Sequence, residues 1–273
     1  MDWSLVLISQ GIESIIERPE NGSGWALVVA PEHSQTAIKT LRQYHVENRG
    51  WPWQQHVFSS GFVFDYASLA WALLAAFFYW FSSVSDLRTP GAMDSTAVGH
   101  GEWWRLFTAM WLHSDLAHLG ANLAIGVVLL GLAMGCYGSG PALLAAYLAG
   151  AGGNLLATVV ASQTHRNVGA SGMIMGSLGL LAAHSITLWR KSPLAPRYIV
   201  SGIVGGIMLF VLLGLTPGTD IIAHLGGFLS GFFLGAVLSL IGDRLRATTA
   251  QAVFVVIFVL MVIVPWFLAL RGR

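Results

Sequence analysis

Residues 221–241 read IIAHLGGFLSGFFLGAVLSLI, a long run that contains no Asp, Glu, Lys or Arg. An α-helix needs about 20 mostly apolar residues to cross the hydrocarbon core of a bilayer. The run therefore predicts a transmembrane helix, although it carries an imidazole, His224, near its start. Ionisable groups at membrane depth are costly and usually mark a functional site.

The rest of the chain has the composition of a polytopic membrane protein. Of its 273 residues, 55% are hydrophobic and only 10% are charged, whereas soluble domains carry about 25% charged residues. The formal charge of +1 gives no sign of nucleic-acid binding, and the single cysteine, Cys136, excludes an intrachain disulfide and a cysteine metal cluster. Residues 1–3 lack the basic start of a signal peptide, so insertion is expected to rely on an internal span.

Seven apolar segments are predicted to span the membrane: residues 66–84, 116–136, 141–162, 171–189, 198–215, 221–241 and 252–270. If the N-terminus is inside, the outer segments hold only five of the 14 Lys and Arg residues, namely Arg88, Arg105, Arg166, Arg271 and Arg273. Cytoplasmic loops carry an excess of Lys and Arg. A cytoplasmic N-terminus and an extracytoplasmic C-terminus are therefore predicted.

Residues 1–50 differ from the rest and predict a small cytosolic α+β domain. The runs 3–8 and 24–30 have the composition of β-strands, and Pro31 is typical of a helix start. The expected division is a domain at 1–50, an interfacial linker at 51–65 and a transmembrane domain at 66–273.

Polar residues recur at one membrane depth in the predicted bundle. Spans two, four and six all run from the outer side to the inner side, so their first turns lie near the outer surface. These turns contain His118 and Asn122, Ser171, and His224, respectively. A serine hydroxyl becomes a good nucleophile when a base within hydrogen-bond reach takes its proton, and histidine has a suitable pKa. The pair predicts a catalytic site.

Small residues beside this pair favour a close approach of spans four and six. Gly172 and Gly176 have the G-x-x-x-G spacing, which Gly227, Gly231 and Gly235 continue on span six. The alternative is that serine and glycine only pack helices and that the histidine bonds a backbone carbonyl. For either residue alone this alternative is the more common role, but their shared depth favours catalysis.

His118 and Asn122 are one helical turn apart, so their side chains point the same way. Together with the backbone N–H of Ser171 at a helix start, they form a candidate site for the oxyanion of a tetrahedral intermediate. The alternative is interhelical hydrogen bonding for stability, worth on the order of 1 kcal/mol.

Taken together, these motifs resemble the rhomboid intramembrane serine proteases, in particular the bacterial kind with a small cytosolic N-terminal domain. The resemblance covers residues 66 to the chain end, and the N-terminal module more loosely. The matching pieces are Trp104-Arg105, His113-x4-His118-x3-Asn122, Gly169-x-Ser171-Gly172 and Ala223-His224-x2-Gly227-x3-Gly231.

The resemblance implies a six-helix bundle with a seventh C-terminal span in a bacterial inner membrane. It also implies a catalytic dyad of Ser171 and His224, and an oxyanion site formed by His118, Asn122 and the Ser171 amide. No metal or cofactor is expected, and the expected partners are transmembrane protein substrates within the lipid bilayer. The implied supporting residues are His113, Gly169, Gly172, Met175, Gly227, Gly231, Trp104 and Arg105.

Two positions depart from the family pattern. Met175 replaces an aromatic residue that often packs against the catalytic histidine, and a thioether can still pack on imidazole. Met134 replaces a glutamate at the end of span two. Outside the motifs, Asp220 is expected in the loop before span six and not as a third catalytic residue, and His165 is expected to be solvated.

Other functions stay open at this point. One alternative is a proteolytically inactive relative that binds transmembrane clients. Such a protein has no need of all four polar residues Ser171, His224, His118 and Asn122. A transporter usually shows internal repeats, which this chain lacks. The sequence does not specify the substrate, and it leaves open whether the N-terminal module regulates activity, recruits partners or forms homodimers.

Overall fold

A computed structural model describes residues 2–18, 24–48, 63–160, 164–187 and 220–271, together with Val200, Val204 and Met208. The chain divides into two compact units, Met1–Gly61 and Phe62–Arg273. Residues 49–62 lie outside the described part, so the linker at 51–65 stays a prediction.

The first unit is a small α+β module. An antiparallel hairpin pairs β1 with β2, so that Ser14 lies opposite Val29. Leu7, Ile12 and Ala37 form its buried core. The elements in chain order are α1 (Asp2–Ser9), β1 (Ser14–Glu17), β2 (Ala26–Val29), η1 (Pro31–His33) and α2 (Ser34–Glu47).

The strand predicted at residues 3–8 is wrong, because this run forms helix α1. The helix packs on α2 and buries Leu7, which is only 1% exposed, in one core with Ile12 and Ala37. For so short an apolar run, tertiary packing outweighs the β-propensity of its residues. The strand predicted at 24–30 and the helix after Pro31 are confirmed as β2 and α2.

The second unit is a helical bundle, and its composition makes the protein an all-α, multi-pass membrane protein. Five described helices are long and apolar enough to cross a membrane. They are α3 (Ala67–Val84), α7 (Leu116–Tyr137), α8 (Ser139–Val160), α11 (Ile221–Ile241, which continues into η4, Gly242–Arg246) and α12 (Thr248–Arg271). Helix α9 (Ser171–Thr187) is apolar but shorter. The predicted span at 198–215 lies outside the described residues except for Val200, Val204 and Met208.

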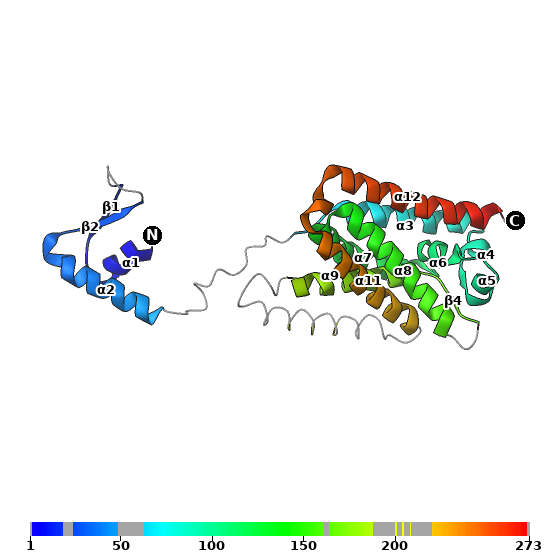
Figure 1. The fold of residues 1–273 in the computed structure, drawn as a ribbon, viewed down its shortest axis with the longest axis horizontal. Helices are drawn as coiled ribbons and strands as arrows, with labels where there is room; N and C mark the ends of the chain where they lie inside the picture. The colour runs from blue at the N-terminus through cyan, green and yellow to red at the C-terminus, as the bar shows by residue number, and fades with distance from the viewer. Residues whose placement is uncertain are drawn as a thin grey trace. The chain divides into compact units, whose positions relative to one another are not determined.

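Helix α9 lies among the other helices of the bundle, where it packs against α7, α8 and α11 (Figure 1). Helix α12 contacts α8 and reaches α3 through stacked rings of Phe78 and Trp266. Short elements connect α3 to α7, and one of them, β3, pairs with β4 just before α9. The connecting elements are α4 (Arg88–Gly91), β3 (Met93–Asp94), α5 (Ser95–Gly99), α6 (Arg105–Thr108) and η2 (Ala109–Trp111), and β4 is Arg166–Asn167, between α8 and α9.

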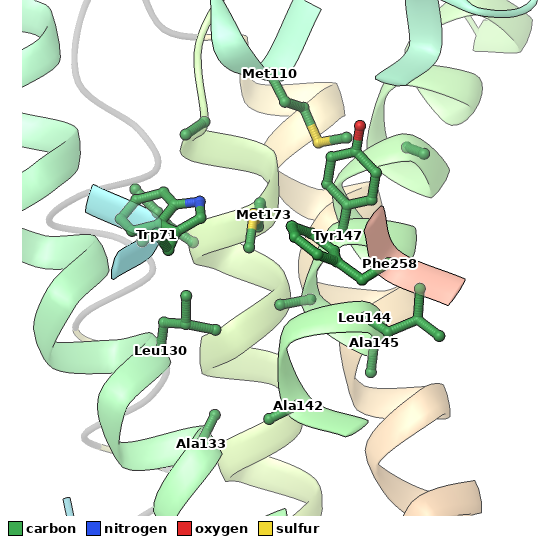
Figure 2. Packing of buried hydrophobic residues seen from close by; sticks show 14 of the residues in the cluster. Trp71, Met110, Leu130, Ala133, Ala142, Leu144, Ala145, Tyr147, Met173 and Phe258 are labelled. Atoms are coloured by element: carbon green, nitrogen blue, oxygen red, sulfur yellow. The ribbon is translucent and has the colours of Figure 1, made fainter. Parts of the chain in front are cut away.

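The core of the bundle is dense and largely apolar. Figure 2 shows Met173 of α9 between Trp71 of α3 and Tyr147 of α8, with Met110 above Tyr147. The Tyr147 hydroxyl accepts a hydrogen bond from the Trp111 indole (3.1 Å), which satisfies both groups away from water. This packing fixes α9 in place and therefore fixes the residues at its first turn.

Candidate active site

Ser171 is the first residue of α9, and Gly169 shapes the turn that leads into it. Gly169 has a φ of +131°, a backbone conformation that suits glycine. Its N–H donates to the carbonyl of Ala109 (3.0 Å). A Cβ at Gly169 would lie 2.9 Å from Nε2 of His118, too close for a real side chain. Glycine therefore allows the His118 ring to lie against the backbone that precedes Ser171.

His224 lies in the first turn of α11 and is buried, at 3% exposed. The backbones of α9 and α11 touch just beyond it, because a Cβ on Gly227 would collide with the carbonyl of Gly172. One turn further, a Cβ on Gly231 would collide with the carbonyl of Gly176. Small residues thus bring the first turns of the two helices to the same level.

The contact between Gly172 and Gly227 brings the start of α9, which carries Ser171, close to the start of α11, which carries His224.

His118 and Asn122 lie one turn apart on α7 and face the start of α9. The ideal Cβ position of Gly169 is 2.8 Å from Cε1 of His118 and 3.9 Å from Nδ2 of Asn122. Asn122 is buried and donates to the carbonyl of His118 (2.9 Å). The structure therefore brings the polar residues of α7, α9 and α11 to one end of the bundle.

Ser114 and Asp115 hold His118 in place, and neither residue was predicted from the sequence to belong to the site. The Ser114 hydroxyl lies 2.9 Å from Nδ1 of His118 and donates to the Asp115 carboxylate (2.8 Å). Asp115 is the N-cap of α7 and accepts from the backbone N–H of His118 (2.8 Å). This N–H, aided by Ser114, holds the pKa of Asp115 below its usual value. An Asp directly before an apolar run is a helix-start signal that predicts the cap.

His113 lies immediately before α7 and is fully buried. Its ring meets the His118 ring edge to face, with centroids 5.3 Å apart. Arg88 donates to the carbonyls of His113 and Ser114 and so holds this turn. Burial, together with the neighbouring His118, lowers the pKa of His113 from 6.5 to about 4.

The buried His113 predicts a specific acid sensitivity. In the unfolded chain His113 takes up a proton near pH 6.5, whereas in the folded chain it does so only near pH 4. The free energy of unfolding is expected to fall as pH drops from 6.5 to 4, by up to about 3 kcal/mol, and this contribution levels off below pH 4. Melting in detergent between pH 4 and 7 measures it. The slope shrinks in His113→Gln; an unchanged slope would contradict the assignment.

Trp104 and Arg105 support the connection between α3 and α7. Arg105 donates to the carbonyls of Thr89 (3.0 Å) and Ala92 (2.7 Å) and to the Glu102 carboxylate (2.6 Å). Trp104 packs against the core of the bundle. These contacts hold the connection that carries β3.

Both methionines that depart from the family pattern are buried in the core. Met175 is 2% exposed and Met134 is 1% exposed. The packing of Met175 on the His224 ring stays a prediction.

Asp220 lies directly before α11, as predicted, whereas His165 differs from its predicted surroundings. Asp220 is the N-cap of α11, where its carboxylate accepts from the N–H of Ala223 (3.0 Å). The same carboxylate lies 2.5 Å from Nε2 of His165 and accepts from Asn167. The prediction that His165 is solvated is therefore wrong, because its side chain is only 23% exposed and pairs with an aspartate distant in the sequence.

Comparisons with known proteins agree with this architecture. The family model described as "Rhomboid domain" matches residues 100–241. RHOMBOID-like protein 5 of Arabidopsis thaliana is 38% identical over 160 residues, which are 58% of this chain and 51% of that protein. Rhomboid protease GluP of Bacillus subtilis is 37% identical over 155 residues, 55% of this chain and 29% of that protein.

A third relative, Rhomboid-type serine protease 2 of Emericella nidulans, is 30% identical over 171 residues, 61% of this chain and 33% of that protein. The chain spans about half or less of the length of these curated relatives. Two of the three are named as proteases. The family match extends over more than half of the 273 residues, and the chain therefore belongs to the rhomboid family.

Proposed function

We propose that this protein is an intramembrane serine endopeptidase that cuts membrane-anchored, single-pass proteins near the outer membrane face. The observation that carries the proposal is the meeting of three helix starts. The first turns of α7, α9 and α11 bring His118 and Asn122, Ser171, and His224 to one end of the bundle, with Gly169 and Gly227 allowing close contact.

In the proposed reaction Ser171 attacks the carbonyl carbon of the scissile peptide bond while His224 takes its proton. The negative charge on the carbonyl oxygen is stabilised by donors from His118, Asn122 and the N–H of Ser171, which has no acceptor within its own helix. His224 then gives the proton to the leaving amine. Water hydrolyses the acyl-enzyme, with His224 again acting as base. The sequence of steps needs no cofactor.

The substrate must present a strand-like or unwound backbone, because the carbonyls of an intact helix are hydrogen-bonded and shielded. Cleavage is therefore expected where a single-pass segment contains small or helix-breaking residues near its outer end. The excess of Lys and Arg on one side supports a cytoplasmic N-terminus. The inner membrane of a bacterium is the location proposed from the family resemblance alone. Ser171 is half-buried, which is compatible with access of water from the outer side.

The experiment that tests this function uses the full chain in proteoliposomes with two single-pass reporters. The reporters differ only at the outer end of the span, which carries Gly-Pro in one and Leu-Leu in the other. We expect cleavage at the outer end of the Gly-Pro reporter and little cleavage of the other. Binding of both reporters without cleavage would favour the alternative of an inactive relative that holds transmembrane clients, and would refute the proposal.

The oxyanion site gives a prediction of its own. Asn122→Ala is expected to lower kcat about 10²–10³-fold with little change in KM, because it removes a donor used mainly in the transition state. Asn154→Ala is a matched control, since Asn154 is also buried and donates to a backbone carbonyl, that of Leu106 (2.8 Å). If Asn122→Ala, like the control, changes only the melting temperature, Asn122 has a structural role and the oxyanion assignment is wrong.

A further inference from the structure

Asp220 joins two segments that carry the proposed dyad. One carboxylate oxygen accepts from the N–H of Ala223 (3.0 Å) and so caps α11 one turn before His224. The other oxygen lies 2.5 Å from Nε2 of His165 and accepts from the amide of Asn167. His165 and Asn167 belong to the segment that leads into Ser171. We call Asp220, His165 and Asn167 together the Asp220 clamp.

A helix cap alone does not explain this arrangement. Ser, Thr, Asn and Asp all serve as N-caps with one oxygen, so the second carboxylate oxygen is free for another task. Here it binds side chains of a different segment. The side chains of His165 and Asp220 are only 23% and 13% exposed, so their interaction is less screened by solvent than a surface pair.

The segment that the clamp grips is itself held from the opposite side. β4 pairs with β3, so that Asp94 lies opposite Arg166. The N–H of His165 donates to the Ser95 hydroxyl (2.8 Å), and the N–H of Ser95 donates to the carbonyl of His165 (2.9 Å). The clamp therefore attaches the first turn of α11 to the β3–β4 pair, a contact separate from the interface between α9 and α11.

From these contacts we infer that Asp220 is a positioning residue, which sets the place of His224 relative to Ser171 by fixing the first turn of α11 to the segment before α9. The inference rests on the proposed function. The glycine contacts lie beyond His224 and set the separation of the helix axes, whereas a first helical turn lacks half of its backbone partners and frays easily. The clamp restrains the turn that carries the base.

Asp220→Ser and His165→Ala test the inference in the full chain. Serine keeps the cap of α11 but cannot reach His165, so the melting temperature changes little. Each variant is expected to lower kcat about 10- to 100-fold, with KM within about threefold, because a displacement of about 1 Å can cost about 100-fold in rate. The double variant is expected to be no slower than Asp220→Ser alone, because Asp220→Ser already removes the contact that His165→Ala removes.

Asp94→Ser is the matched control. Asp94 also caps a short helix, α5, and also pairs with a β4 residue, Arg166 (2.8 Å), so its carboxylate bonds to α5 and β4, whereas that of Asp220 caps α11. The Arg166 side chain is 76% exposed, so this pair contributes little. We expect kcat of Asp94→Ser within about twofold of wild type. Wild-type kcat in Asp220→Ser, or losses that multiply in the double variant, would overturn the inference.

Hydrogen exchange separates failure of the clamp from failure of the proposed function. The amides of the first turn of α11 are expected to exchange faster in Asp220→Ser and His165→Ala than in wild type or Asp94→Ser. This readout needs no catalysis. If the variants exchange faster but the wild type shows no Ser171-dependent cleavage, the proposed protease function is refuted and the clamp is supported. Unchanged exchange refutes the clamp.

Discussion

Ser171→Ala and His224→Ala each lower kcat/KM for cleavage of a single-pass reporter by at least about 10⁴-fold, the loss expected when a nucleophile and its base act as a unit. Without the hydroxyl no acyl-enzyme forms, and without the imidazole the hydroxyl keeps its proton. The double variant is no worse than either single one, because the first change already disables the pair. Quantitative product detection in proteoliposomes measures these rates.

Controls for the dyad come from the same chain. Ser177 lies further along α9 and its hydroxyl donates to the carbonyl of Met173 (3.2 Å), so Ser177→Ala tests the loss of a serine from this helix. His100 ends α5 and is exposed, so His100→Ala tests the loss of a histidine. Both retain activity within about threefold, since neither removes a transition-state contact. Rates in Ser171→Ala or His224→Ala that match these controls would refute the dyad.

Gly231→Leu destabilises the bundle by about 3 kcal/mol or more, because the added side chain must displace backbone and not another side chain. A Cβ at Gly231 would lie 2.7 Å from Cα of Gly176, and the Gly176 carbonyl is closer still. Helices α9 and α11 must then separate. Unfolding in detergent measures the loss, and reporter cleavage falls with it, because the separation also moves Ser171 from His224.

Gly120→Leu is the control for this substitution. Gly120 also lies in a membrane helix, α7, but nothing lies within 4 Å of its Cβ position. Replacing it removes the helix penalty of a glycine, about 1 kcal/mol, so the variant is expected to be as stable as wild type or more stable. Equal effects at Gly231 and Gly120 would show that close helix contact is not what stabilises α9 against α11.

Much of the transmembrane architecture could be predicted from the sequence, because a long apolar run is stable in a bilayer as a transmembrane helix. Five of the seven predicted spans correspond to helices of sufficient length and apolar composition. The glycines around Ser171 and His224 indicated close helix contact, since small residues are what such contact requires. The family resemblance, drawn from the same motifs, is confirmed by the match over residues 100–241.

Other features depend on tertiary contacts that no local pattern encodes. The run at residues 3–8 folds as α1 because Leu7 finds a buried site with Ile12 and Ala37. The pairing of His165 with Asp220 joins residues more than 50 positions apart. The caps were within reach of the sequence, since Asp115 and Asp220 each precede an apolar run. The second interaction of Asp220, with His165 and Asn167, could not be predicted from the sequence.

The most direct test of the central claim is labelling by a fluorophosphonate, which reacts with an activated serine. Purified full-length protein in detergent would be labelled, digested and mapped by mass spectrometry. We predict one modified residue, Ser171, with labelling abolished in Ser171→Ala and in His224→Ala but retained in Ser177→Ala. Absence of labelling in the wild type, or labelling of Ser171 that persists in His224→Ala, would contradict a nucleophile activated by this histidine.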